Sequence, residues 1–359
     1  MSERAATSEV SEAQRAHYPP VCICIPAFNA AKTIRETLAS ALAQTYPNFR
    51  IVVLDNASTD GTRDIVRSFA DPRISLVQQE SNIGAVANFD LCIQVADGTY
   101  TEIFHADEVY APDMVAKQVA AMEAHPEAGV VFTEGNLIDS ESRVFGETSV
   151  AKFIGAESGS VAIRQYEALV PALYRAGNFL LCSGALVRTA IYKDLVQRWR
   201  ADIFASSCDL DVWMRIAEKH PVLFILEKLM STRTSLTQAS YLEIKRNTNR
   251  ADMFLVLDHY LEDSRTRAAL TPEDLAGYEA MQRMDRARRA MNLYMLGKSA
   301  EASAVLDDNL VLSLLTYAWR SRRGLMTCLL TVYLKGAILS RADRLGRAVM
   351  RYVERRMSA

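Results

Sequence analysis

The chain contains 359 residues, half of them hydrophobic, which is enough for one sizeable core and a smaller appended domain. Its 41 basic and 43 acidic residues nearly cancel, so a nucleic acid is not an expected partner. The six cysteines show no CxxC pair and no zinc-ligand spacing, a pattern typical of reduced thiols in a cytosolic protein. We expect no signal peptide, and no uncharged apolar run reaches the ~18 residues that a membrane-spanning helix needs.

From Val21 onward, short apolar runs alternate with segments of helical periodicity. Asn29 is positioned to cap the first helix, in which Ile34 and Leu38 recur at helical spacing. Alternating strands and helices predict a doubly wound α/β fold with a mostly parallel sheet. The predicted strands are residues 21–25, 49–55, 74–77, 100–104 and 129–133.

Polar side chains directly follow three of these strands. They occupy residues 26–29 after the first strand, 55–58 after the second and 105–108 after the fourth. In a doubly wound sheet, ligands bind outside the carboxyl ends of the strands, near the switch in strand order. The sequence therefore predicts an acidic binding cleft at this edge of the sheet.

Five motifs follow one another along the chain: IPAFNA, LDNASTDGT, SNIGAVANFD, FHADEVYAPDM and HPEAGVVF. Each is weak alone, but in this order they resemble the N-terminal half of family 2 glycosyltransferases. The likeness covers roughly residues 20–235. The resemblance implies a GT-A fold, which binds a nucleotide diphosphosugar, and the transfer of a sugar from that donor to an acceptor hydroxyl.

The resemblance also implies which residues bind the donor. Asp55 would accept the imide N–H of uracil, although an aspartate at a strand end also serves as a turn former. Arg233 would pair with the diphosphate, or would have a structural role instead. The complete donor-binding set is Pro26, Ala27, Phe28, Asn29, Asp55, Asn56, Ser58, Gly84, Asn88, Asp107 and Arg233.

The tetrapeptide HADE, residues 105–108, stands where the family carries an acidic metal-binding motif. Carboxylate oxygens are the ligands that Mg²⁺ and Mn²⁺ prefer, and substrate phosphates complete the shell. By resemblance, Asp107 would contact the ribose or the metal, and Glu108 the metal. His105 replaces the first acidic residue of the motif, and Glu108 replaces the usual final aspartate. Glutamate is one methylene longer, so the position or choice of metal is expected to shift. The alternative is a solvated loop with two acidic residues.

The segment SSCDLDVWMR resembles the acidic-dyad helix of the family, with Cys208 in the place of the first acid and Asp209 in that of the catalytic base. Trp213 is predicted to pack inward from the same helix. A carboxylate at a helix N-terminus stays ionised readily, which suits a general base. The alternative is that Asp209 and Asp211 only cap the helix. Arg215 is predicted to anchor it through a salt bridge.

Together these features predict an inverting, metal-dependent glycosyltransferase that uses a UDP-sugar and Mn²⁺ or Mg²⁺. The expected acceptor is a glycan or a lipid-linked molecule in bacterial surface polysaccharide or glycoconjugate synthesis. Two alternatives stay open. One is a metal-dependent nucleotidyltransferase, although IPAFNAA lacks the glycine-rich, basic character typical of that class. The other is a catalytically decayed scaffold that binds nucleotide sugars.

The sequence divides into a lead-in, residues 1–18, expected to be disordered; a GT-A domain, residues 19–238; and a helical accessory region, residues 239–359. Helices are predicted within this last region at 239–262, 272–296 and 300–318.

The final stretch of the chain, residues 319–359, has ten basic residues against two acidic ones. Leu345, Val349 and Val353 recur every four residues, so they form an apolar stripe on a helix. Such a helix lies on an anionic membrane, or it packs its apolar stripe on the enzyme. We therefore expect a cytoplasmic protein, peripheral on the inner face of the plasma membrane. The basic stripe of the same helix comprises Arg341, Arg344, Arg347, Arg351 and Arg355.

Overall fold

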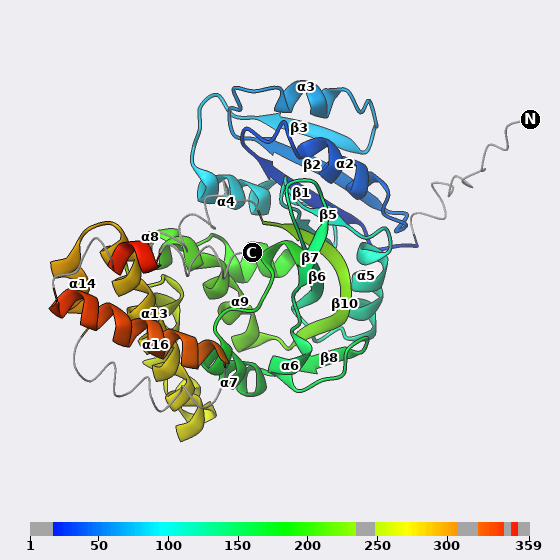
Figure 1. The fold of residues 1–359 in the computed structure, drawn as a ribbon. Coiled ribbons are helices and arrows are strands. Elements are labelled where there is room, and N and C mark those ends of the chain that lie inside the picture. Colours follow the sequence, from blue (N-terminus) through cyan, green and yellow to red (C-terminus); the bar gives the residue numbers. More distant parts are fainter. Residues whose placement is uncertain (1–16, 235–247, 307–321, 341–345, 351–359) are drawn as a thin grey trace, which may run out of the picture. The chain divides into compact units, whose positions relative to one another are not determined.

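The computed structural model describes residues 17–234, 248–306, 322–340 and 346–350 (Figure 1). It divides into two compact units. The first contains the chain up to Leu169 together with Phe179–Thr234, and the second contains Val170–Asn178 and the segments after Thr234. Among the described helices, we find none with the length and apolar character needed to cross a membrane.

The first unit contains a ten-stranded mixed sheet, with eight strands in the order β3-β2-β1-β4-β9-β6-β10-β5. Strands β1 to β4 run parallel to one another, as do β6 and β10, whereas β5, β7, β8 and β9 are antiparallel to their neighbours. The predicted α/β class is therefore confirmed. The strands are β1 (Val21–Ala27), β2 (Phe49–Asp55), β3 (Ile74–Gln78), β4 (Tyr100–Ile103), β5 (Val109–Tyr110), β6 (Val130–Ile138), β7 (Val144–Glu147), β8 (Val161–Arg164), β9 (Ala185–Arg188) and β10 (Val222–Arg233).

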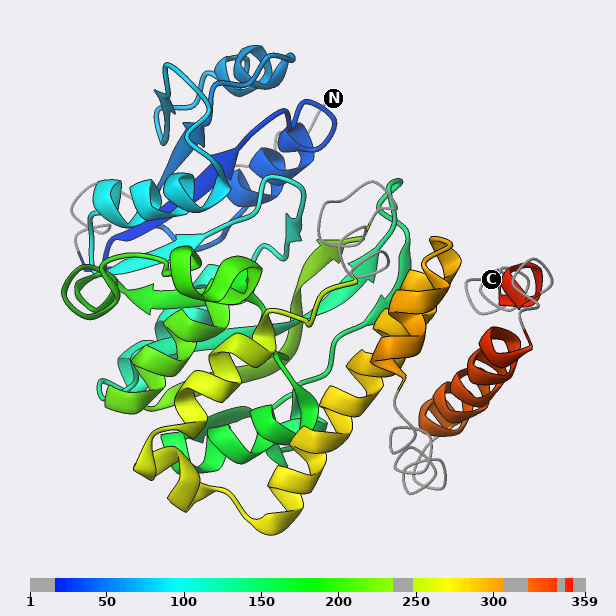
Figure 2. The ribbon, with the colours of Figure 1, turned by 90° about the vertical axis from the view of Figure 1, so that its left-hand side faces the viewer.

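Helices cover both faces of the parallel strands (Figures 1 and 2). On one face, Ile23 of β1 packs with Leu38 of α2. On the other, the Sγ atoms of Cys22 and Cys24 lie 3.7 Å apart, and Cys24 Sγ lies 3.6 Å from the carbonyl of Cys92 on α4. These three buried, free cysteines form a thiol layer between the sheet and α4. The helices up to the end of β10 are α2 (Ile34–Leu42), α3 (Thr62–Arg67), α4 (Ala85–Val95), α5 (Met114–Ala124), α6 (Ala151–Ile154), α7 (Tyr166–Ala176), the 3₁₀ helices η1 (Cys182–Gly184) and η3 (Ala205–Ser207), the π-helix η2 (Ile191–Val196), α8 (Ala201–Phe204) and α9 (Cys208–Lys219).

A buried carboxyl group, that of Glu102, lies in the middle of the sheet on β4. Its Oε1 accepts a hydrogen bond of 2.9 Å from Gln118 Nε2 on α5, which also donates to the carbonyl of Gly184. Burial raises the pKa of Glu102 to about 8, against the lowering effect of the Gln118 hydrogen bond. This carboxyl group is therefore largely protonated at neutral pH.

The second unit is helical. Its longest helix, α13, begins with a capping box in which Thr271 Oγ1 accepts from the N–H of Asp274, and Asp274 Oδ2 accepts from the N–H of Thr271. This confirms the helix predicted for 272–296, whereas parts of the other two predicted helices lie outside the described residues. Tyr294 and Leu334 share a core cluster in which α13 packs with α14 and α16. The helices of this unit are α11 (Met253–Leu261), α12 (Ser264–Ala269), α13 (Pro272–Met295), α14 (Ser299–Val305) and α16 (Arg322–Leu339).

Candidate active site

The candidate site lies where three neighbouring parallel strands end. In the sheet register, Ala27 at the end of β1 pairs with Asp55 at the end of β2. On the other side of β1, Cys24 pairs with Ile103, and the N–H of Phe104 continues this ladder to the carbonyl of Cys24. The register therefore brings the segments after β1, β2 and β4 to one edge of the sheet, as the sequence predicts.

Asp55 carries a buried carboxylate with one oxygen in use. Its Oδ2 accepts a hydrogen bond of 3.1 Å from the N–H of Ser58, and Arg63 Nε lies 3.8 Å away. Its Oδ1 is buried and has no hydrogen-bond partner among the described residues. A buried acceptor without a partner is costly, so this oxygen is suited to accept a hydrogen from a ligand.

The segment after β1 is tied to the loop after β2. The N–H of Asn29 donates to Ser58 Oγ over 2.9 Å, and Asn29 Oδ1 accepts from the N–H of Thr59 over 2.8 Å. Asn29 has a left-handed backbone with φ of 48°, and α2 begins only at Ile34. The prediction that Asn29 caps this helix is therefore wrong, because its side chain bonds to a loop distant in sequence.

Three further residues of the predicted donor set fix the backbone around Asp55. Asn56 Nδ2 donates to the carbonyl of Gly84, and Asn56 Oδ1 accepts from the N–H of Ile83. Asn88, on α4, donates from Nδ2 to the carbonyl of Leu54 over 2.9 Å. Gly84 has φ of 89°, a conformation that favours glycine. The structure thus places Asn56, Gly84 and Asn88 in the framework of the site.

The start of this framework also presents apolar surface. Phe28, next to Asn29, and Ile83, next to Gly84, are both exposed. Pro26 and Ala27 form the end of β1 itself, and Ala27 is buried. Phe28 and Ile83 therefore present an aromatic and an aliphatic surface to solvent, each beside a loop that is bonded to the segment after β2.

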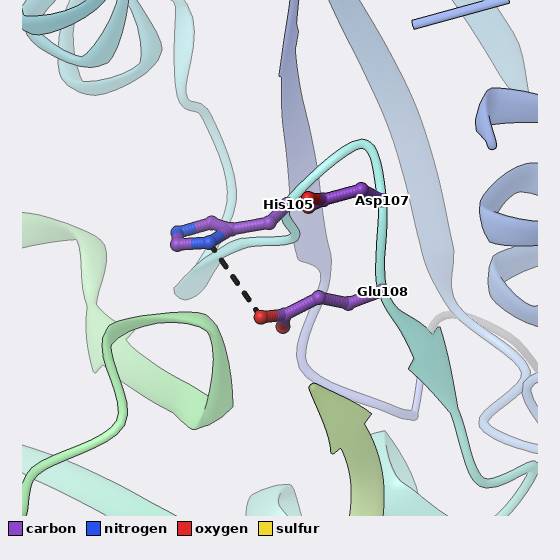
Figure 3. Close-up of side chains that lie close together, drawn as sticks. All are labelled: His105, Asp107 and Glu108. Carbon is purple, nitrogen blue, oxygen red and sulfur yellow. Dashed lines mark ion pairs between the residues drawn. The ribbon is translucent and has the colours of Figure 1, made fainter. Parts of the chain in front are cut away.

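The HADE segment brings three possible metal ligands together. His105, Asp107 and Glu108 each offer a ligand atom, and these atoms all lie within 4.8 Å of one another. Figure 3 shows the imidazole of His105 directed toward the carboxylate of Glu108, with 3.8 Å between Nδ1 and Oε1. Carboxylate oxygens are preferred ligands of Mn²⁺ and Mg²⁺, and imidazole is a common ligand of divalent metal ions. The three residues therefore fit a divalent cation.

Glu108 is the most deeply buried member of this triad, at 4% exposure. Burial raises its pKa to about 8, and the charge of Asp107 adds to this effect, while hydrogen bonds from Ser183 and Tyr110 act against it. A bound cation would favour the ionised form, because it supplies the positive charge that the pocket lacks. Tyr110 also accepts, at its hydroxyl, the N–H of His105 over 2.7 Å.

Arg233, at the end of β10, holds the loop that carries Asp107. Its guanidinium donates to the carbonyls of Asp107 (2.9 Å) and Asp139 (2.8 Å), and to Glu36 Oε2 (2.6 Å) and Ser142 Oγ (3.0 Å). The side chain is 5% exposed. The guanidinium thus makes four hydrogen bonds within the protein. This favours the structural role over the contact with a diphosphate, which the sequence also allowed.

Asp209 lies in the first turn of α9. Trp213 is fully buried, as predicted for the inward face of this helix. Asp211 is also buried and forms ion pairs with Arg200 and Arg215, the latter over 3.0 Å. The salt bridge between Arg215 and Asp211 lies within α9, but Arg215 also donates to the carbonyls of Val196 and Arg198 outside it. Arg215 therefore anchors the helix through these hydrogen bonds, and the salt bridge that leaves the helix is the one between Asp211 and Arg200.

One residue that the sequence did not indicate connects Asp209 with the HADE segment. Cys182 lies in η1, immediately before Ser183, whose side chain bonds to Glu108. Burial raises the pKa of the Cys182 thiol, and the nearby carboxylates of Asp209 and Glu108 raise it further. Both carboxyl groups are therefore near enough to Cys182 for their charges to act on its thiol.

The geometry agrees with comparisons to known proteins. Residues 22–195 match the model of glycosyl transferase family 2. The first half of the chain is therefore similar to this family. One relative is the UDP-Glc:alpha-D-GlcNAc-diphosphoundecaprenol beta-1,3-glucosyltransferase WfaP of Escherichia coli, which is 34% identical over 29% of this chain and 41% of the relative. The chain spans 41% to 47% of the length of the bacterial relatives that match it first.

Solved structures show the same fold. The Staphylococcus aureus protein TarS, residues 1–349 in complex with UDP-GlcNAc, aligns with a TM-score of 0.54 at 15% identity, over 94% of this chain and 92% of TarS. The mannosyltransferase PcManGT of Pyrobaculum calidifontis, in complex with GDP-Man and Mn²⁺, aligns with a TM-score of 0.52 at 19% identity, over 90% of this chain and 87% of that one. This chain therefore shares the GT-A fold of these proteins.

Proposed function

We propose that this protein is an inverting glycosyltransferase that moves a sugar from a UDP-sugar to a hydroxyl group of a glycan or lipid-linked acceptor. The observation that carries the proposal is the arrangement at one edge of the sheet. Asp55 offers a buried carboxylate oxygen with no hydrogen-bond partner among the described residues, HADE offers three possible metal ligands, and the charges of Asp209 and Glu108 act on the same thiol. Donor binding, charge neutralisation and proton transfer each have a suitable group there.

In the proposed reaction, Asp209 accepts the proton of the acceptor hydroxyl. The hydroxyl oxygen attacks the anomeric carbon as the bond from that carbon to the diphosphate oxygen breaks, so an α-linked donor gives a β-linked product. Asp209 is suited to this role because the N-terminus of α9 favours its ionised form. Asp107, Glu108 and His105 would hold Mn²⁺ or Mg²⁺, which when bound supplies Lewis-acid stabilisation of the diphosphate.

Uridine is our choice of base for two reasons. The vacant oxygen of Asp55 can accept the imide N–H of uracil, and Phe28 offers an exposed aromatic face nearby in the fold. The names of WfaP and of the TarS complex both contain a UDP-sugar. The acceptor that WfaP is named for is linked to undecaprenol diphosphate, which supports a lipid-linked acceptor here. We accordingly place the protein in the cytoplasm, at the inner face of the plasma membrane.

The test is a screen of nucleotide sugars with Mn²⁺ or Mg²⁺, read out as release of nucleotide diphosphate. A UDP-sugar should give release, and the anomeric configuration of the product, measured by proton NMR, should be opposite to that of the donor. Binding without release under all conditions would indicate a scaffold instead. Formation of pyrophosphate from a nucleoside triphosphate and a sugar phosphate would indicate a nucleotidyltransferase.

A further inference from the structure

Helix α16 has a buried face and an exposed face. Cys328, Thr331 and Leu334 are buried, and Cys328 and Leu334 belong to the core cluster shared with α13 and α14. Large apolar side chains on the same helix are between 41% and 75% exposed. These exposed side chains, which we call the α16 stripe, are Leu325, Met326, Leu329, Val332 and Leu339.

The α16 stripe follows one face of the helix and is interrupted at Gly336. Leu325, Leu329 and Val332 follow one another by four and three residues, and Gly336 continues the same spacing to Leu339. These positions lie on one face of an α-helix, and at 1.5 Å per residue the stripe is about 21 Å long. An apolar surface of this kind, in contrast to scattered apolar residues, indicates an interaction site.

The charge around the stripe indicates what it binds. The sequence of α16 itself, Arg322–Leu339, contains three basic residues and no acidic one, whereas the whole chain has a formal net charge of −2. A second copy of the chain would bring the same positive charges against each other, so a homodimer through this face is disfavoured. An anionic lipid surface complements both the charge and the apolar side chains. Figure 2 shows α16, in orange to red, as a helix beside α13.

We propose that the α16 stripe is a membrane-docking surface, which lies in the plane of an anionic bilayer with Leu325, Leu329 and Val332 inserted among the lipid chains. Because no described helix is long and apolar enough to cross a membrane, the helix would lie at the interface. This inference deepens the location proposed above, but it does not depend on glycosyl transfer. The membrane surface predicted from the arginine-rich helix after residue 340 falls mostly outside the described residues, so α16 provides an independent basis.

The experiment uses the full chain and sucrose-loaded vesicles of phosphatidylcholine with 25% phosphatidylglycerol, and vesicles of phosphatidylcholine alone. The test variant is Leu325→Gln, Leu329→Gln, Val332→Gln. The matched control is Val144→Gln, Phe145→Gln, Val161→Gln, which removes three apolar side chains of the first unit that are 54% to 63% exposed. Because all six residues are exposed, both variants should fold, which circular dichroism checks.

The wild type and the control should co-sediment with the anionic vesicles, less at high salt and weakly with neutral vesicles. The test variant should lose on the order of 10- to 100-fold in its partition coefficient, with donor hydrolysis unchanged. Equal binding by the test variant, or equal binding of the wild type to both vesicle types, would overturn the proposal. So would a wild-type dimer, seen by light scattering, that becomes a monomer in the test variant without any vesicle binding. Loss of hydrolysis alone would concern the proposed function only.

Discussion

Replacement of Arg233 by lysine separates the two roles that the sequence allows for this residue. The arginine donates to the carbonyls of Asp107 and Asp139 and to the side chains of Glu36 and Ser142. A lysine keeps the charge but cannot satisfy acceptors that lie around a planar guanidinium. Two partly buried carbonyls would lose a partner, at about 1–3 kcal/mol for each unsatisfied group. Because water can still reach them in part, we expect a loss in the lower part of the summed range, about 2–4 kcal/mol in unfolding free energy.

Urea unfolding followed by tryptophan fluorescence measures this loss. Trp199 and Trp213 are both buried in the first unit, so their emission reports mainly on the unit that contains Arg233. The matched control is Arg143→Lys, because Arg143 bonds to Asp139 on the same hairpin but is 73% exposed, and it should leave the transition nearly unchanged. A stable Arg233→Lys protein whose KM for the donor rises about tenfold would refute the structural role and favour a diphosphate contact.

Four further predictions follow from the site and the core. Asp209→Asn should leave donor binding nearly intact and reduce turnover by about 10²-fold or more, measured as nucleotide release; turnover within a few-fold of wild type would reduce Asp209 to a helix cap. Chelation by EDTA should abolish turnover and Mn²⁺ or Mg²⁺ should restore it, while Glu108→Ala should weaken metal-dependent nucleotide binding in calorimetry; full activity in EDTA would exclude the metal. Asp55→Ala should weaken UDP binding by about 1.5–3 kcal/mol in calorimetry, and an unchanged affinity would move the base site elsewhere. Burial raises the pKa of Glu102 to about 8 from an ordinary value of 4.5, so the contribution of Glu102 to the unfolding free energy is fully present below about pH 4.5 and is lost as the pH rises through 8. Glu102→Gln should therefore flatten the decline in the unfolding free energy, measured in urea, between pH 6 and 8. An identical decline in both proteins would contradict this.

The sequence predicted the part of the site that follows the parallel strands, because hydrophobic runs located β1, β2 and β4 and the polar residues come directly after them. Asp55 and the HADE segment required no knowledge of tertiary contacts to be placed at one edge. The sequence did not indicate Cys182 and Ser183, because their place in the site depends on a tertiary contact. They precede β9, a strand of four residues without alternation, and they reach Glu108 only because β9 pairs antiparallel with β4.

Asn29 shows where a local pattern fails. Asparagine is a residue type that often caps helices, but the side chain of Asn29 is fixed by a bond to Thr59, which is distant in sequence. Arg233 shows what a local pattern leaves open. Its four acceptors come from separate segments that no spacing in the sequence brings together, so its structural contacts could not be predicted.

The thiol layer between β1 and α4 is an intrinsic probe of whether α4 separates locally from the sheet. Cys22, Cys24 and Cys92 are buried. The contact with Cys24 and burial raise the pKa of Cys22 well above that of a free thiol. The contact with Cys22 lowers the pKa of Cys24, but the contact with Cys92 and burial outweigh it and raise this pKa well above the ordinary value. A thiol reagent can therefore reach them only when α4 separates from the sheet. Helix α4 also carries Asn88, which donates to the carbonyl of Leu54, directly before Asp55. Alkylation rates with and without UDP would therefore measure how far the nucleotide reduces the local opening of this helix. Equal rates would mean that the nucleotide does not affect this opening.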